Sequence, residues 1–272
     1  MSTKENTQWK KNELMSHPNR PNTIDYINSI FPDFIELKGD RLFGDDPSLI
    51  GGIASIGGIA VTIVGNVKGH NLDERIHTNF SMAKPEGYRK TIRLMKQAEK
   101  FKRPVICFVD TLGAYPGREA EERGQGSAIA HCIAQAINLN VPIISVLIGD
   151  GGSGGALALC VADYLIALEH AALSVISPKA CASILWNDAS RHTDAARMLK
   201  MDAVCLSDLG VVDIVVYEPG DGAHTDPHVT SKRIQESLYH SLTFLNSISI
   251  KRLVRLRKKK YSEIGNKYIR FK

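Results

Sequence analysis

The stretch "IGDGGSGGALAL", residues 148–159, places five glycines within seven positions. The apolar run "PIISVLIG" (142–149) leads into it and a helical pattern follows, so the stretch is predicted to join a buried strand to a helix. Glycine lets a backbone approach a ligand closely, and the first amides of a helix lack partners within the helix and favour negative charge. The same residues fit the G-x-S-x-G pattern, in which Ser153 would be a hydrolase nucleophile. The stretch therefore predicts a site at a strand–helix junction and leaves two chemistries open.

A second strand ends in the same way, since "VICFVD" (105–110) runs into the glycine-bearing loop "TLGAYPG" (111–117). Loops of this kind cradle a phosphate or stabilise an oxyanion. The phosphate loop G-x-x-x-x-G-K-[ST] needs a Lys-Ser/Thr pair that does not follow here. The dinucleotide fingerprint, forced onto residues 149–154, lacks an acidic residue at a later strand end. Nucleotide binding is therefore disfavoured.

Ser153 has a functional and a structural interpretation. A serine hydrolase needs a histidine and an acidic partner in addition to the serine. Several histidines follow in the chain and none is distinguished from the others by its surroundings: His170, His192, His224 and His228. A glycine-rich loop that contains serine matches G-x-S-x-G readily, and a serine at this position typically caps the helix that it opens. The local pattern favours the cap.

Apolar runs alternate with helical patterns through most of the chain. Strands are predicted in residues 50–69, as a pair joined by a Gly57-Gly58 turn, and at 104–110, 142–149, 164–169 and 173–177. Helices are predicted at 23–31, 85–101 and 118–139, from Ser153, and from Pro178. Near-continuous apolar strands between helices are typical of an α/β fold in which the sheet is buried on both sides, built here of stacked β-β-α units. We expect one domain at 41–228, a helical N-terminal extension at 1–40, and C-terminal helices with a basic tail at 229–272.

Composition restricts the class of protein further. The 272 residues are 43% hydrophobic and 23% charged, which is typical of a globular protein. The polar N-terminus does not read as a signal peptide, and charged residues interrupt the longest apolar run, 156–177, so no membrane span is expected. The five cysteines form no C-x-x-C pair, which indicates reduced thiols in a cytoplasmic protein.

The positive charge is concentrated at the C-terminus. Residues 251–272 hold ten lysines and arginines and one glutamate, a net charge of +9, whereas the whole chain carries +5. Because no aromatic platform accompanies these charges, a solvated helix or a partner contact is favoured over binding of nucleic acid.

Many segments of the chain, in order and at the right spacing, resemble the carboxyltransferase alpha subunits of bacterial acetyl-CoA carboxylases. They run from "HPNRP" (17–21) through "PEGYRK" (85–90), "GAYPG" (113–117) and "GGSGGALAL" (151–159) to "CASILW" (181–186). The resemblance implies a crotonase (ClpP)-like fold and a subunit of an α2β2 heterotetramer. In that family this subunit handles carboxybiotin, borne on a biotin carboxyl carrier protein that an ATP-dependent biotin carboxylase loads. The beta partner carries zinc and binds acetyl-CoA, and the product, malonyl-CoA, begins fatty acid synthesis.

The resemblance also implies roles for individual residues. The backbone amides of Gly154 and Gly155 would form an oxyanion hole for the ureido oxygen of biotin, so that Ser153 is not a nucleophile. Residues near these amides would bind substrate: Gly151, Gly152, Gly113, Ala114, Tyr115 and Pro116. The residues themselves leave two positions possible for the Tyr115 side chain: it lines the biotin channel, or it packs under the loop. No metal is expected in this chain.

Several positions depart from the family pattern, among them His70, His77 and Thr78 in a segment that lacks several of the family's usual arginines. Leu112 replaces a usual proline, Asp150 a usual glutamate, and Lys179-Ala180 a usual Glu-Gly pair. These departures leave three alternatives open: a carboxyltransferase for another acyl-CoA, a related decarboxylase subunit, and a regulatory paralogue.

Overall fold

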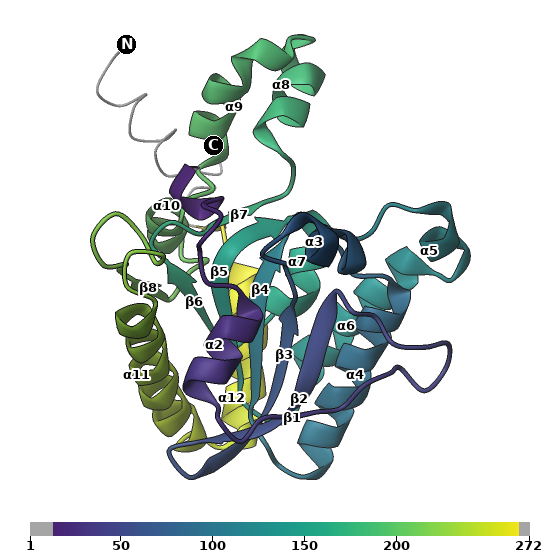
Figure 1. Cartoon of the computed structure of the whole chain (residues 1–272). Helices are drawn as coiled ribbons and strands as arrows, with labels where there is room; N and C mark the ends of the chain where they lie inside the picture. The colour runs from purple at the N-terminus through teal and green to yellow at the C-terminus, as the bar shows by residue number, and fades with distance from the viewer. Residues whose placement is uncertain (1–12, 267–272) are drawn as a thin grey trace.

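A mixed eight-stranded sheet forms the centre of the computed structural model, which describes residues 13–266 (Figure 1). The strands are β1 (Ile35–Glu36), β2 (Leu49–Ile56), β3 (Ile59–Asn66), β4 (Val105–Thr111), β5 (Ile143–Gly152), β6 (Tyr164–Leu168), β7 (Ala172–Ser174) and β8 (Ile214–Val216). Their order is β1-β2-β3-β4-β5-β6-β8, and β7 pairs with the far end of β5. The pairs β1–β2 and β2–β3 are antiparallel, and every later pair is parallel, so the carboxyl ends of β3 to β6 lie at one edge.

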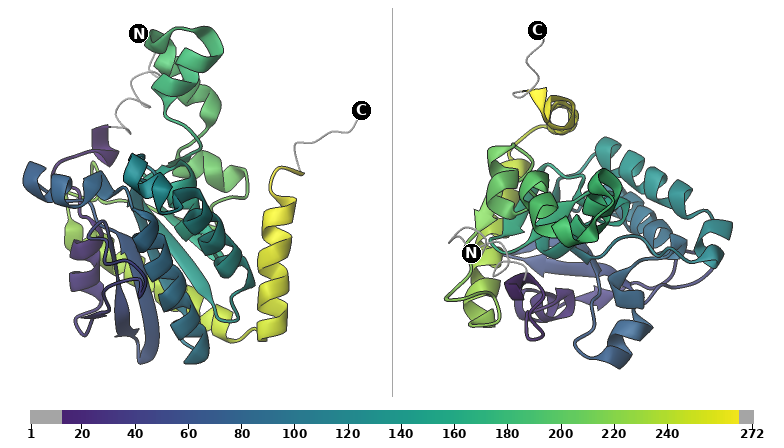
Figure 2. Two further views of the ribbon diagram at one scale, coloured as in Figure 1. Left: turned by 90° about the vertical axis from the view of Figure 1, so that its right-hand side faces the viewer. Right: turned by 90° about the horizontal axis from the view of Figure 1, so that it is seen from above.

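Helices cover both faces of the sheet. They are α2 (Thr23–Ile30), α3 (Leu72–His77), α4 (Pro85–Lys100), α5 (Arg118–Glu122), α6 (Gln125–Asn138), α7 (Ser153–Cys160), α8 (Pro178–Trp186), α9 (His192–Leu199), α10 (Ala203–Asp208), α11 (Pro227–Asn246) and α12 (Ile250–Glu263). Helices α2 and α11 pack together on one face, and α4, α6 and α7 pack on the other, with α12 against the outer side of α6 (Figure 2). The apolar strand patterns are explained by this double cover, because all seven residues of β4 are buried.

Most predicted elements are present, and the exceptions have local causes. The pair β2–β3 turns at Gly57 and Gly58, whose φ angles of 55° and 79° suit glycine. The single helix predicted at 118–139 is wrong: Gly124 adopts φ 82° and separates α5 from α6. The strand predicted to end at residue 149 continues to Gly152, because β7 pairs with its last three residues. Strand β1 lies within the segment predicted as a helical extension, and two residues are too short for a periodic signal.

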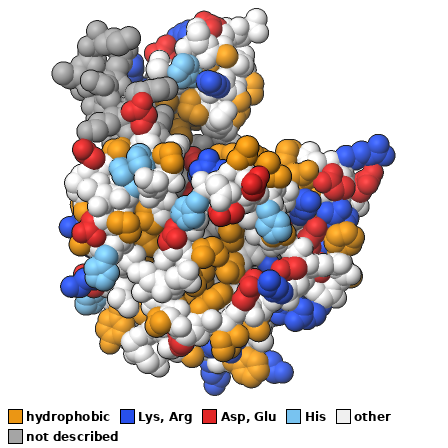
Figure 3. Space-filling model, in the orientation of Figure 1, with side chains coloured by type: hydrophobic (Ala, Val, Ile, Leu, Met, Phe, Trp, Pro, Cys, Tyr) orange, Lys and Arg blue, Asp and Glu red, His pale blue; other side chains and the backbone are white. Residues whose placement is uncertain are grey.

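Helices α8 and α9 project from the body of the molecule (Figures 1 and 2). Only Ala182 of α8 is buried, although the helix is rich in apolar residues. Large apolar side chains are exposed on this projection, among them Ile184 at 74% and Leu185 at 58%. Figure 3 shows such side chains on the surface of the hairpin among polar ones. This surface has no covering element within the described part of the chain.

Helix α12 holds much of the basic segment against the body. Its Arg257 is buried and pairs with Asp163 at 2.7 Å, while neighbouring cations on the same helix face solvent. The basic residues beyond 266 lie outside the described residues. Among residues 13–266, no helix is both long and apolar enough to cross a lipid bilayer.

Candidate active site

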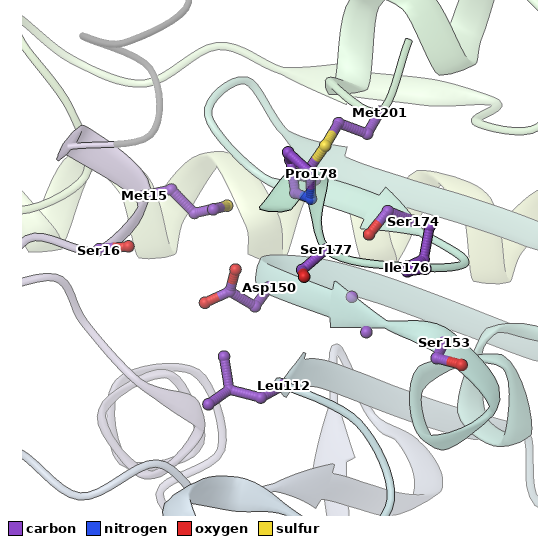
Figure 4. Close-up of a pocket in the computed structure, with 13 residues that line it drawn as sticks. Met15, Ser16, Leu112, Asp150, Ser153, Ser174, Ile176, Ser177, Pro178 and Met201 are labelled. Carbon is purple, nitrogen blue, oxygen red and sulfur yellow. The ribbon is translucent and has the colours of Figure 1, made fainter. Parts of the chain in front are cut away.

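A cleft of about 310 Å³ lies where the carboxyl ends of β4 and β5 meet the N-terminal segment and the segment after β7 (Figure 4). It is lined by Met15, Ser16, Leu112, Asp150, Gly151, Gly152, Ser153, Ala172, Ser174, Ile176, Ser177, Pro178 and Met201. Asp150 is the only carboxylic acid or base among these side chains. The edge of a parallel sheet where strands end is a usual place for a ligand site.

The two glycine loops predicted from sequence pack directly on one another beside this cleft. A Cβ atom at Gly152 would overlap the carbonyl of Leu112. A Cβ atom at Gly155 would lie 2.5 Å from the backbone nitrogen of Ala114 and would overlap the carbonyl carbon of Gly113. These obstacles are backbone atoms, which cannot rotate away. Gly152 and Gly155 are therefore required for the close approach of the two loops.

Helix α7 begins at the cleft with uncapped backbone amides. In an α-helix the amides of the first three residues, here Ser153, Gly154 and Gly155, have no acceptor within the helix. The preceding residue is Gly152, so no side chain accepts from these amides at the N-cap position. The helix dipole adds partial positive charge at the same end. The arrangement can stabilise a negative oxygen that comes within reach of these donors.

Ser153 neither caps the helix nor belongs to a catalytic triad. The predicted cap is wrong, because Ser153 is the first helical residue and adopts φ 49°. Its side chain is exposed, and in Figure 4 the hydroxyl points away from Asp150 and Ser177. No histidine is among the described residues that line the cleft, so none of them forms the serine–histidine pair that a hydrolase nucleophile needs.

The other predicted residues divide between the cleft and its support. Gly151 and Gly152 line the cleft, whereas Gly113 and Ala114 contact Gly155 from behind. Tyr115 and Pro116 are not among the described residues that line the cleft. The ammonium of Lys84 lies 4.9 Å from the centre of the Tyr115 ring, and a Cβ atom at Gly117 would overlap the same ring. Both interpretations of Tyr115 remain predictions.

A buried ionic cluster beside the cleft was missed by the sequence analysis. Lys68, just beyond β3, donates to Asp110 Oδ1 at 3.2 Å and to Asp150 Oδ2 at 3.1 Å. Burial alone would lower the pKa of Lys68, but the two carboxylates outweigh it and raise that pKa above its ordinary value. Burial raises the pKa of Asp150, and the charge of Asp110 adds to the rise. The feature of the sequence that could have indicated this cluster is that two predicted strands stop at an acidic residue, Asp110 or Asp150.

A second buried pair anchors the N-terminal segment next to this cluster. Arg20 donates to both carboxylate oxygens of Glu218, at 2.7 and 2.6 Å, and to the carbonyl oxygen of Ile148 at 3.0 Å. Burial would raise the pKa of Glu218, but the hydrogen bonds and charge of Arg20 lower it overall. Met15 and Ser16 are thereby held at the wall of the cleft.

Four of the departures from the family pattern, Leu112, Asp150, Lys179 and Ala180, lie at this cleft or directly beside it. The side chain of Leu112 is 56% exposed and lies across from Asp150. Lys179 and Ala180 occupy the first turn of α8, directly after the cleft residues Ser177 and Pro178. All four positions therefore lie close enough to the cleft to affect which ligand binds there.

The fold is that of crotonase-like carboxyltransferases. One chain of a Pseudomonas malonate decarboxylase hetero-tetramer in complex with coenzyme A superposes with a TM-score of 0.67 at 19% identity, over 82% of this chain and 87% of that one. A transcarboxylase 12S chain superposes with a TM-score of 0.65 at 21% identity, over 80% of this chain and 41% of that one. At such low identity these structures show the fold alone.

The sequence identifies the family. The pattern of the family described as acetyl co-enzyme A carboxylase carboxyltransferase-like matches residues 2–265. A Treponema denticola protein described as acetyl-coenzyme A carboxylase carboxyl transferase subunit alpha is 53% identical over 264 residues, 97% of this chain and 87% of that protein. A Clostridium perfringens protein of the same description is 52% identical over 258 residues, 95% of each chain. The chain belongs to the acetyl-CoA carboxylase carboxyltransferase alpha family.

Proposed function

We propose that this chain is the alpha subunit of an enzyme that transfers the carboxyl group of carboxybiotin, borne on a carrier protein, to acetyl-CoA, giving malonyl-CoA. The observation that carries the proposal is the uncapped start of α7 beside an open cleft. Membership of the family adds the class of reaction, because its named relatives are carboxyl transferase subunits.

The role of this chain is to stabilise negative charge with backbone donors. The family implies biotin-dependent chemistry, and biotin, when bound, supplies the ureido group that carries the carboxyl. The amides of Gly154 and Gly155 would face the ureido oxygen, and each such donor contributes about 2.7–4 kcal/mol to lowering a barrier. The glycines fit this group, because the loops leave their donors fixed in advance by backbone packing. Gly151 and Gly152 would form the adjoining wall.

The described side chains that line the cleft offer few groups that could act as a nucleophile or as a general acid or base. Asp150 is paired with Lys68, and no histidine is among the described residues that line the cleft. Acid–base work at the acyl group would then belong to the substrate or to the partner subunit. The donor atoms that this chain contributes are main-chain amides, so its contribution to catalysis is electrostatic.

The naming of the relatives as alpha subunits implies a beta partner and a multi-subunit carboxylase complex. We propose an α2β2 heterotetramer in which the beta subunit carries zinc and binds acetyl-CoA, working with a biotin carboxyl carrier protein and an ATP-dependent biotin carboxylase. The exposed apolar surface of α8 and α9 supports a large contact with that partner. A cytoplasmic location is supported by the five free cysteines.

A carboxyltransferase for a different acyl-CoA is the second candidate, because Leu112 faces the cleft in place of the family's usual proline. The test combines purified chain, beta partner and carboxylated carrier with acetyl-CoA or propionyl-CoA, and measures the carboxylated product. The proposal predicts malonyl-CoA as the preferred product. Preference for propionyl-CoA would select the second candidate, and no transfer to either thioester by the intact, assembled complex would contradict both.

A further inference from the structure

An irregularity in the ladder between β4 and β5 lies directly before the glycine loop. Val109 pairs with Leu147, and the next pair is Thr111 with Gly151, so β5 advances by four residues while β4 advances by two. Such a bulge tilts the strand that carries the extra residues and leaves some of its backbone groups without ladder partners. Because α7 follows at once, the tilt of β5 sets the direction in which the α7 amides point.

Charged side chains replace the missing ladder contacts at the bulge. The Asp150 amide donates to Asp110 Oδ1 at 3.0 Å, and the Ile148 carbonyl accepts from Arg20 Nε at 3.0 Å. Between them, a Cβ atom at Gly149 would lie 2.5 Å from Asp110 Oδ1. The carboxylate of Asp110 is thus pressed against the bulged backbone.

Lys68 provides the positive charge that this arrangement requires. Its ammonium bridges Asp110 and Asp150, so it joins three neighbouring strand ends, those of β3, β4 and β5. The side chains of all three residues are largely buried, which strengthens their interaction relative to surface pairs. Without the ammonium, two carboxylates would face one another beside the bulge, and Asp150 would be pushed toward the cleft.

We propose that Lys68 is a positioning residue for carboxyl transfer: it holds Asp110 and Asp150 together and so fixes the bulge that aims the α7 amides. Lys68 acts through the backbone of β5 and does not line the cleft itself. The inference rests on the proposed role of Gly154 and Gly155.

Lys68→Met is the principal test, made in the complex with the beta partner and assayed by carboxyl transfer. A misplaced donor of this kind costs about 100-fold in turnover, so kcat is expected to fall by about that factor while KM for the acyl-CoA stays unchanged. Lys68→Arg, which keeps the charge, should recover most of the loss. Lys90→Met is the matched control, because Lys90 is also buried and paired, with Asp45 at 2.5 Å, but lies away from the cleft.

The pH profile distinguishes positioning from a general loss of stability. Within the described residues, several titratable and charged groups surround Lys68, in the cluster and in the two cavities that Lys68 lines: Asp110, Asp150, Arg20, His17, His70, Arg75, Asp25, Glu74 and His77. In Lys68→Met the facing carboxylates should share a proton at low pH, which relieves their repulsion. The turnover of this variant relative to the natural protein should therefore rise as pH falls. The double variant Lys68→Met/Asp150→Asn, which restores the charge balance, should recover about tenfold over Lys68→Met even at high pH.

The outcomes separate this inference from the proposed function. Inactivity of the natural complex would refute the proposed function. With an active natural complex, a Lys68→Met turnover within threefold of it, or a loss equal to that of Lys90→Met, would overturn the positioning role. If Lys68→Met fails to fold, the double variant Lys68→Met/Asp150→Asn supplies the comparison. A folded double variant whose turnover is no more than one hundredth of the natural value would also overturn the positioning role.

Discussion

The five glycines of the loop are present for different physical reasons. Gly152 and Gly155 face backbone atoms of the β4 loop, and Gly149 faces the carboxylate of Asp110. Gly154 is different, since a Cβ atom there would meet only the methyl of Ile129 at an ordinary 3.8 Å. At the residue scale, Gly149, Gly152 and Gly155 are required because a side chain there would collide with neighbouring atoms. At Gly154 only the main-chain amide is required.

Alanine substitutions at the two amide-bearing glycines should therefore differ. Gly155→Ala forces the two loops apart, which costs about 1–3 kcal/mol of stability and displaces the donors, with about a 100-fold loss of turnover. Gly154→Ala keeps its amide and has room for the methyl, so its turnover should stay within a few-fold of the natural value. Steady-state transfer kinetics and thermal unfolding measure both. Equal turnover in the two variants would contradict the distinction.

Ser153→Ala tests the nucleophile directly. The hydroxyl is exposed and caps nothing, so its removal should leave turnover nearly unchanged and shift the free energy of unfolding by no more than about 0.5 kcal/mol. Ser153→Gly, which suits φ 49° better, serves as a companion variant. A thousandfold loss of turnover with an intact fold would restore the hydrolase interpretation.

At the scale of elements, the C-terminal helix α12 is attached by a buried arginine. Arg257 donates to Asp163 and to the carbonyl oxygens of Ala136, Leu139 and Val141, where α6 ends and its chain turns into β5. The carbonyl of Ala136 lies in the last turn of α6, where the helix dipole places partial negative charge. The helix therefore joins the fold through this buried charged side chain, through the ion pair of Lys260 with Asp213, and through apolar contacts such as Leu253.

Arg257→Ala should consequently be strongly destabilising. It leaves Asp163 buried without its cation, and breaking a buried pair in this way costs about 3–5 kcal/mol. Arg255→Ala, on the exposed face of the same helix, is the control and should change stability by about 0.5 kcal/mol or less. Denaturant unfolding of the two variants measures the difference. A similar small effect for both would mean that α12 is dispensable for the fold.

The helices and strands could be predicted from the sequence more accurately than the contacts between them. Strands such as β4 and β5 were predictable because burial on both faces gives continuous apolar runs. The break at Gly124 was not, since the glycine is followed by a good helical pattern. Lys68 could not be assigned a role, because its partners lie 42 and 82 residues away and the bulge that unites them has no local signature.

At the scale of the whole molecule, the projecting hairpin predicts where assembly occurs. Replacing Ile184 on α8 with glutamate should leave the fold intact, since the side chain is exposed, but should prevent stable association with the beta partner. Phe101→Glu, at the exposed carboxyl end of α4, is the matched control and should assemble normally. Size-exclusion chromatography of the mixed subunits measures association. Normal assembly of Ile184→Glu would place the interface elsewhere.

The central claim is that this chain supplies one set of oxyanion donors and depends on a partner for the acyl-CoA. A thioester enolate needs a second set of donors, and within residues 13–266 the cleft presents one set, at the start of α7. Decarboxylation of malonyl-CoA in the presence of biotin, with and without the beta subunit, tests the claim most directly. The predicted result is no turnover by the isolated chain and clear turnover by the mixture. Turnover by the isolated chain at a rate comparable to that of the mixture would contradict the division between the two subunits.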